Sequence, residues 1–352
     1  MRKLLKLALL AMVAIGFSAC GNTEWRSSMD DNFNIVEYYV IKDTNIKHGE
    51  YKKYSPERVL LVKTKYKDGK EDGKYQEWRS NGELWVETTY SDGKLDGKYK
   101  EYHENGKIWV EANYKDDKKS GKYKKYHYNG QLNIETTYKD GKKDGQYMEY
   151  GSDGNIRIDA NYKDDEKDGI YKEYNSDGKP KIEANYRDGK YYGSYKKYHN
   201  NGNIHIDANY KDDFIKDGSY KEYDYYGKIS IDANYKDGKL DGSYKSYYAD
   251  TEEQPHIIAN YKDGKKDGIY KKYHSNGKLE IDANYKDGEE DGNYKEYYSS
   301  GKIHKEMTYK DGELDGIQKT HYWQNYGQGT ITVESIYESG KFIKSKQYNS
   351  NE

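Results

Sequence analysis

The sequence has little of what usually stabilises a compact secreted domain or spans a membrane. Its 352 residues include one cysteine, Cys20, and three prolines. A single cysteine excludes a framework of disulfides within the chain. The apolar run from Leu7 to Phe17 is too short to cross a bilayer as a helix of the mature protein. Packing must therefore stabilise the fold without disulfides.

The sequence also lacks a charge excess and the motifs of common enzymes. The chain has 60 Lys and Arg residues and 62 Asp and Glu residues, so its formal net charge is −2. Without a basic surplus to neutralise phosphates, we expect no nucleic-acid partner. The chain contains neither a G-x-S-x-G nucleophile motif nor a glycine loop that binds phosphate. The sequence therefore predicts a protein that is not an enzyme and needs no cofactor.

Tyrosine and glycine are abundant, with 45 and 35 copies, and they recur periodically. A tyrosine opens each repeat at Tyr66, Tyr90, Tyr114, Tyr138, Tyr162, Tyr186, Tyr210, Tyr235, Tyr261, Tyr285, Tyr309 and Tyr337. The spacing is 24 residues for six steps, and then 25, 26, 24, 24 and 28. A period in this range is typical of stacked-repeat architectures.

Each repeat has the pattern of a β-hairpin. In the segment 278–285, Leu279, Ile281, Ala283 and Tyr285 alternate with polar residues, which indicates a half-buried strand. A preceding segment, 269–274, is rich in Tyr and Lys, and Asn276-Gly277 between the two is a hairpin turn signal. The connection 286–292 carries two Asp-Gly pairs, which we also interpret as turns.

The first strand of each hairpin leaves one question open. Tyr270 and Tyr273 are three residues apart, so a regular strand would direct them to opposite faces. Either both faces of the sheet carry a row of tyrosines, or a β-bulge brings both tyrosines to one face.

The repeated pattern Tyr-Lys-Asp-Gly-Lys-x-Asp-Gly-x-Tyr-Lys-Glu-Tyr-x-x-Asn-Gly-Lys-Ile resembles the MORN repeat, in the variant form common in bacteria. The resemblance covers roughly residues 39–345. Proteins with this variant of the repeat include the group known as YwqK-like antitoxins. It implies a single antiparallel sheet of consecutive hairpins that serves as a scaffold or binding surface. Proteins with this repeat are linked to membranes, to protein partners and to toxin neutralisation.

The predicted fold class is all-β, an elongated single antiparallel β-sheet of tandem hairpins of ~24 residues. Residues 38–316 form the repeat array, and 317–352 form a degenerate C-terminal repeat or cap. With strands ~4.8 Å apart, the array is expected to be a monomer with a length on the order of 115 Å.

The N-terminal segment has the features of an export signal. Residues 1–19 join a positively charged start to an apolar run, which is typical of a signal peptide. The residues Phe17-Ser18-Ala19-Cys20 resemble the lipobox of bacterial lipoproteins, which implies lipidation of Cys20. Residues 20–37 are then a lipidated N-terminus and tether. We expect a lipid-anchored protein of the cell envelope, at the outer membrane or the cell surface.

Two metal hypotheses are weaker than their structural alternatives. The Asp residues of the Asp-Gly pairs lack the ligand spacing of a calcium loop, so we interpret them as turn residues. His103, His127, His199 and His274 occupy equivalent positions, but neighbouring copies are about 10 Å apart at two strand spacings. No metal site is predicted, and these histidines are expected to be exposed at strand ends.

The residues favoured as binding candidates are aromatic side chains outside the consensus positions. They are Tyr191, Tyr192, Tyr225, Tyr226 and Trp109. We expect the four tyrosines to be replaceable without loss of the fold. The predicted function is a surface or periplasmic lipoprotein whose sheet binds an unknown protein or glycan. The alternative is an antitoxin or immunity protein that neutralises a toxin partner.

Overall fold

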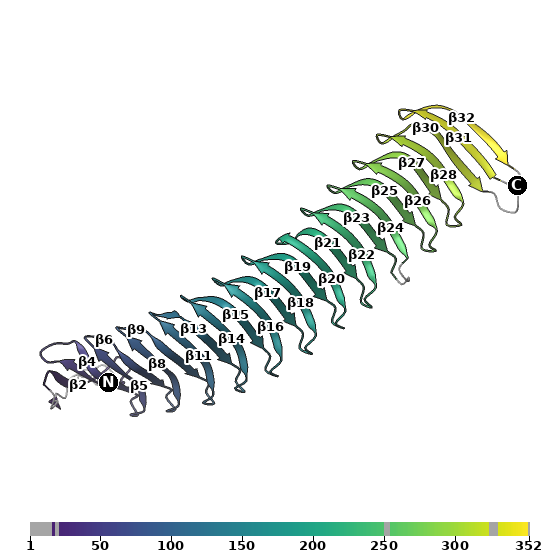
Figure 1. Cartoon of the computed structure of the whole chain (residues 1–352). Helices are drawn as coiled ribbons and strands as arrows, with labels where there is room; N and C mark the ends of the chain where they lie inside the picture. Colours follow the sequence, from purple (N-terminus) through teal and green to yellow (C-terminus); the bar gives the residue numbers. More distant parts are fainter. Residues whose placement is uncertain (1–15, 18–20, 250–253, 324–329, 351–352) are drawn as a thin grey trace, which may run out of the picture. The chain divides into compact units, whose positions relative to one another are not determined.

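The computed structural model describes residues 16–17, 21–249, 254–323 and 330–350, and all regular structure within them is β-strand. The chain divides into two compact units, Met1–Gly169 with Ser176–Gly178, and Ile170–Asn175 with Lys179–Glu352. In each unit, successive strands form antiparallel hairpins that follow one another along the chain (Figure 1). Cys20 and most of the predicted signal peptide lie outside the described residues.

The strands of the first unit are β1 (Gly16–Phe17), β2 (Thr23–Met29), β3 (Ile35–Ile41), β4 (Lys47–Tyr54), β5 (Leu60–Lys67), β6 (Lys70–Glu71), β7 (Gly73–Trp78), β8 (Leu84–Ser91), β9 (Lys94–Leu95), β10 (Gly97–Tyr102), β11 (Ile108–Lys115), β12 (Lys118–Lys119), β13 (Gly121–Tyr126), β14 (Leu132–Lys139), β15 (Lys142–Tyr150) and β16 (Ile156–Lys163). The division between the units falls within β17 (Glu166–Tyr174).

The strands of the second unit are β18 (Pro180–Arg187), β19 (Lys190–Tyr198), β20 (Ile204–Asp212), β21 (Ile215–Tyr223), β22 (Ile229–Lys236), β23 (Lys239–Tyr247), β24 (Pro255–Lys262), β25 (Lys265–Tyr273), β26 (Leu279–Lys286), β27 (Glu289–Tyr297), β28 (Ile303–Lys310), β29 (Glu313–Leu314), β30 (Gly316–Trp323), β31 (Thr330–Glu338) and β32 (Lys341–Ser350). Pro180 is the first residue of its strand, where a missing amide donor is best tolerated.

The two kinds of connection use different turns. Within the hairpin of β25 and β26, the loop closes through bonds from Gly277 N to His274 O (3.0 Å) and from His274 N to Lys278 O (2.8 Å). Gly277 has a positive φ of 82° and Asn276 does not. Asn276 instead accepts a hydrogen bond from Lys278 N through its side-chain oxygen. The loop is thus a turn followed by one left-handed glycine, rather than a two-residue turn with both residues left-handed.

The return connection is the tighter of the two. Asp287 and Gly288, with φ values of 50° and 99°, form a two-residue turn between β26 and β27. Both residues are left-handed, which matches the twist of the flanking strands. The second Asp-Gly pair was predicted to be a turn, and this prediction is wrong, because Asp291 and Gly292 lie inside β27. There the pairing register shifts between Ala283 and Tyr285, and Gly292 has a φ of 99°.

A β-bulge near the loop decides how side chains are divided between the faces. Tyr270 lies opposite Ala283, Lys272 lies opposite Ile281, and Tyr273 then lies opposite Leu279. Glu280 is the extra residue, and it forms an ion pair of 2.7 Å with Lys272. The bulge therefore interrupts the alternation predicted for 278–285, since Leu279 joins Tyr273 on one face while Ile281 and Ala283 stay on the other.

Both faces of the sheet carry a row of tyrosines, which answers the question that the sequence left open. On one face, the first tyrosine of a hairpin packs against the tyrosine that opens the next repeat, as in Tyr270 and Tyr285, whose ring centroids are 5.5 Å apart. On the other face, the second tyrosine donates its hydroxyl to a carboxylate of the preceding hairpin, as from Tyr198 to Glu183 (2.8 Å). We call these the paired-Tyr face and the Tyr-Glu face.

The core lies on the paired-Tyr face, where tyrosine rings cover small residues. Ala208 and Ala233 are completely buried, and Tyr210 and Tyr220 are buried with them. Edge-to-face ring pairs of this kind contribute about 0.5–1.5 kcal/mol each beyond their buried area. Burial raises the pKa of Tyr195 and Tyr294 to about 12. Tyrosine rings thus provide the apolar layer over the small buried alanines.

The structure confirms the all-β class and the tandem antiparallel hairpins. It corrects the predicted tether, because residues 23–29 form β2, which pairs along its whole length with β3. Val36 and Val40 of β3 are buried, so this pairing covers part of the core. No helix that could cross a membrane is found in the described part of the chain.

Candidate functional site

The edge of the sheet formed by the Asn-Gly loops is tied together by side chains. The histidine that precedes a loop lies with Nε2 within hydrogen-bonding distance of a backbone carbonyl of the next hairpin. These pairs are His103 and Tyr126 O (3.2 Å), His127 and Tyr150 O (2.9 Å), His199 and Tyr223 O (3.1 Å), and His274 and Tyr297 O (3.0 Å). The histidines therefore link hairpins, and the expectation that they are merely exposed strand ends is wrong.

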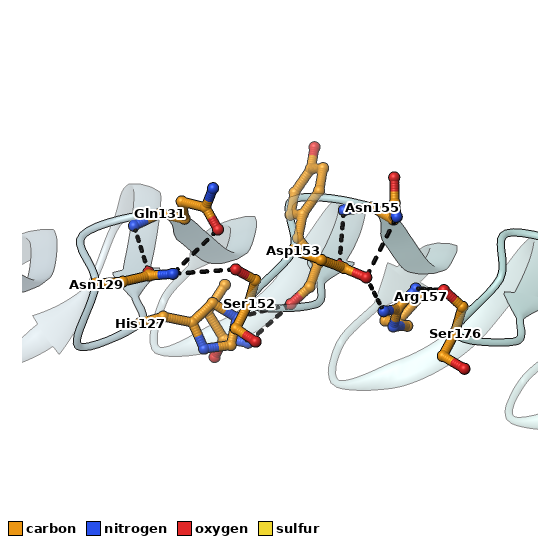
Figure 2. Close-up of polar contacts among 10 residues, drawn as sticks. His127, Asn129, Gln131, Ser152, Asp153, Asn155, Arg157 and Ser176 are labelled. Atoms are coloured by element: carbon orange, nitrogen blue, oxygen red, sulfur yellow. Dashed lines mark hydrogen bonds and ion pairs between the residues drawn. The ribbon is translucent and has the colours of Figure 1, made fainter.

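Loop asparagines add a second link, which Figure 2 shows at one place. Asn129 Nδ2 donates to the carbonyl oxygen of Ser152 in the next loop (3.0 Å). In the following repeat, glycine replaces histidine at position 151, and Arg157 takes over the linking role. It pairs with Asp153 (2.6 Å) and donates to Ser176 O (3.3 Å). Successive loops are thus held at fixed positions relative to one another.

At one point on this edge, three rings from two hairpins meet. We call His103, Trp109 and Tyr128 ring corner 1. The imidazole of His103 lies 5.8 Å from the Trp109 ring and 5.3 Å, edge to face, from the Tyr128 ring. Asn105 Nδ2 donates a hydrogen bond to the backbone carbonyl oxygen of Tyr128 (2.8 Å). Tyr128 is 60% exposed and Trp109 36% exposed, so the corner offers ring surface to solvent.

The same arrangement is built again in the second unit, as ring corner 2, which consists of His199, His205 and Tyr225. The two imidazoles stack with centroids 4.3 Å apart, and Tyr225 lies edge to face at 5.7 Å from His199. Asn201 Nδ2 holds Tyr225 O (2.6 Å), as Asn105 holds Tyr128. Burial and the neighbouring His199 lower the pKa of His205, which favours its neutral form.

The bulge places Trp109 and His205 at these corners. Both residues occupy the extra position of their strands, where the register shifts. Trp109, Tyr225 and Tyr226 are recognisable in the sequence because they depart from the consensus. His103, Tyr128, His199 and His205 were not predicted as binding residues, since membership of a corner depends on contacts between hairpins. Comparison of equivalent positions between repeats was the signal that could have found them.

The remaining candidates lie elsewhere. Tyr191 and Tyr192 are near the opposite, Asp-Gly edge of the second unit, so the four tyrosines do not form one cluster. Tyr191 packs against the buried residues, with its ring 4.7 Å from Tyr186 and 5.1 Å from Phe214. The expectation that Tyr191 can be replaced without loss of the fold is therefore corrected. Tyr192 is more exposed, and Arg187 covers its ring at 3.5 Å.

The repeated aspartates have structural partners. The second Asp of a pair accepts the turn amide of the next repeat, as Asp267 Oδ2 does from Asp287 N (3.3 Å). The first Asp adopts the left-handed turn conformation. Within the described residues, no group of three His, Cys, Asp or Glu side chains is arranged to hold a metal ion.

Removing one histidine link is expected to weaken the fold measurably. His103→Ala deletes the bond to Tyr126 O, so the free energy of unfolding should fall by about 1 kcal/mol. Urea denaturation followed by circular dichroism measures this change. His48→Ala is the control in the same unit, because the bonds of His48 to the exposed Asp68 are longer (3.3 Å to Oδ1 and 3.4 Å from its amide nitrogen), and its effect should stay within about 0.5 kcal/mol. Equal losses for the two variants would contradict the linking role.

Comparison with known families supports the repeat assignment. Seven segments, which together cover somewhat less than half of the chain, match the family model of the MORN repeat variant. They are residues 71–92, 95–116, 119–140, 167–188, 191–212, 266–287 and 290–311. A search of curated proteins finds no match. The hairpins at these positions thus match the MORN repeat variant, and ring corner 1 lies within two of the matched segments.

Proposed function

We propose that this protein is a non-enzymatic, lipid-anchored scaffold of the cell envelope whose repeat sheet binds a protein or glycan partner. The observation that carries the proposal is the recurrence of the ring corner. Two exposed aromatic corners with the same construction stand on hairpins that hydrogen bonds hold in place. Rigid, partly exposed aromatic rings are well suited to recognition, because they contribute contact area at little entropic cost.

The anchoring part of the proposal rests on the sequence. The export signal of residues 1–19 and the lipobox ending at Cys20 support lipidation of Cys20. Positions 21 and 22 are Gly and Asn, so the Asp that acts as a retention signal for the inner membrane in enteric bacteria is absent there. This favours the outer membrane or the cell surface. Several acyl chains on one cysteine anchor a protein stably, whereas one chain does not. The nearly balanced charge supports a partner other than nucleic acid.

The anchoring proposal predicts a loss of membrane association for Cys20→Ala. Cells that express the full chain or this variant are fractionated, and palmitate incorporation is followed by labelling. The parent should be labelled and sediment with membranes. The variant should be unlabelled and appear in the soluble fraction or as an unprocessed precursor. An unlabelled parent chain whose mature N-terminus is not Cys20 contradicts lipidation.

An antitoxin or immunity protein is the alternative, and it rests on the resemblance alone. An exported lipoprotein does not meet a cytoplasmic toxin, so this alternative requires a toxin that acts at the envelope. A toxin gene beside the gene for this chain, together with binding of that toxin, would favour it over a general scaffold.

A further inference from the structure

Trp85 and Trp109 occupy the same position in two neighbouring hairpins of the first unit. Each is the extra residue of a bulge, in β8 and in β11 respectively. Arg79 lies 5.4 Å from the Trp85 ring, at the place where His103 accompanies Trp109. The Arg79 side chain donates to Tyr102 O (2.6 Å), as His103 pairs with Tyr126 O. Tyr128, in the loop of the next hairpin, is not at the equivalent position, but it lies near Trp109 because the His103 ring contacts both. The three rings form an aromatic strip that runs across the strands (Trp85, Trp109 and Tyr128).

The spacing of this strip selects one kind of extended ligand. Neighbouring strands lie ~4.8 Å apart, so the equivalent residues Trp85 and Trp109 of successive hairpins are about 9.6 Å apart. A polyproline II helix rises ~3.1 Å per residue and has three residues per turn, so one turn advances about 9.3 Å. A β-strand instead places side chains of one face about 6.8 Å apart, which does not match the repeat.

The charges near the strip favour a neutral ligand. Glu101 accepts hydrogen bonds from Trp85 Nε1 and from Tyr99 (both 3.1 Å). Lys125 lies 5.7 Å from the Trp109 ring and Arg79 stacks on Trp85. These charged groups thus already contact the rings or the backbone of the sheet. Trp109 and Tyr128 offer exposed ring surface, Trp85 is half-buried beside Arg79, and the strip does not select a strongly charged polymer.

We propose that Trp85, Trp109 and Tyr128 bind a proline-rich segment of a partner protein in the polyproline II conformation, with one proline on each tryptophan and Tyr128 beside the second. This proposal rests on the proposed scaffold function and names its partner class. Aromatic grooves recognise such segments because the ligand is already ordered before it binds. The chain itself has only three prolines, at positions 56, 180 and 255, so a second copy does not supply the ligand.

The test titrates the full chain, purified in mild detergent, with a neutral synthetic peptide that carries proline at every third position. A peptide of the same composition with its prolines adjacent is the first control. Isothermal titration calorimetry should show that the periodic peptide binds at least about tenfold more tightly, because only its prolines match the hairpin spacing. Equal affinity for the two peptides would overturn the proposal.

Variants locate the binding site. Trp109→Ala should weaken binding of the periodic peptide at least about tenfold, as expected for an aromatic anchor that the ligand covers. Trp109→His is the second variant, because histidine occupies the equivalent position at His205, so the fold is expected to tolerate it. Trp323→Ala is the matched control, since Trp323 is an exposed tryptophan outside the strip. Unchanged affinity in both Trp109 variants, or an equal loss in Trp323→Ala, contradicts the assignment.

A glycan partner is a separate outcome of the same experiment. A β-1,4-linked glucose oligosaccharide is titrated in parallel with the peptides. Binding of the oligosaccharide without binding of the periodic peptide overturns the proline-rich ligand, while the proposed scaffold function would still be supported. Loss of lipidation at Cys20, by contrast, affects only the proposed anchoring and leaves the peptide titration unchanged.

Discussion

Raising the pH above 10 is expected to unfold the protein cooperatively. An ordinary tyrosine has a pKa near 10, and burial raises the pKa of Tyr195 and Tyr294 to about 12. Burial followed by the bond to a carboxylate raises the pKa of Tyr102 and Tyr126 to about 12 as well. Many other tyrosines on the paired-Tyr face are shifted in the same direction, as Tyr270 and Tyr309 are.

The sign follows from proton binding. Between pH 10 and about pH 12, the unfolded chain has lost tyrosine protons that the folded chain still holds. The free energy of unfolding therefore falls as the pH rises through this window, and the full contribution is present below pH 10. The many tyrosines of the chain make this effect unusually large.

The measurement compares two signals in one alkaline titration. Tyrosinate absorbance should appear together with loss of the β-sheet circular dichroism, in one steep transition. Tyr195→Phe removes one shifted group and should reduce the pH dependence of stability. Gradual ionisation of most tyrosines near pH 10 with an unchanged sheet signal would show that the rings are not protected.

The second large effect is expected from truncation of a core tyrosine. Tyr220 is buried, its hydroxyl donates to Glu222 (3.1 Å), and Lys216 lies 3.4 Å from its ring centroid. Tyr220→Ala removes the ring that covers the buried alanines, so the free energy of unfolding should fall by about 3 kcal/mol. Because repeats stabilise their neighbours, the loss should extend to the adjacent hairpins.

Two controls separate burial from chemistry. Tyr226→Ala removes the same side chain from an exposed loop of the same unit and should change stability by no more than about 0.5 kcal/mol. Tyr220→Phe keeps the ring and loses only the hydroxyl bond, at a cost of about 1 kcal/mol. Urea midpoints give the comparison. Similar losses for Tyr220→Ala and Tyr226→Ala would refute the assignment of the core to the paired-Tyr face.

Much of the repeat was accessible from local sequence, because its signals are local. The alternation of Ile281, Ala283 and Tyr285 predicts a strand with one buried face, and the structure confirms it. Asn276-Gly277 and Asp287-Gly288 both mark real reversals of the chain. Turn propensity and side-chain alternation depend on neighbours within a few residues, so a pattern of this length specifies them.

Other features depend on which residues lie opposite one another, which a local pattern does not specify. The bulge at Glu280 arises from the pairing register of two strands, and it moves Leu279 to the other face. Tyr191 and Tyr192 are adjacent and chemically identical, yet Tyr191 packs in the core and Tyr192 is more exposed. Only the position of each side chain relative to the sheet separates them.

By itself, the sequence determined the hairpin unit, its period and the all-β class, because every copy repeats the same short-range signals. The tertiary structure alone decided that both faces carry tyrosines, and that residues 23–29 of the predicted tether form strand β2. It also brought His103 and Trp109 of one hairpin against Tyr128 of the next. These contacts join residues about one repeat apart, and they exist only after the strands have paired in register.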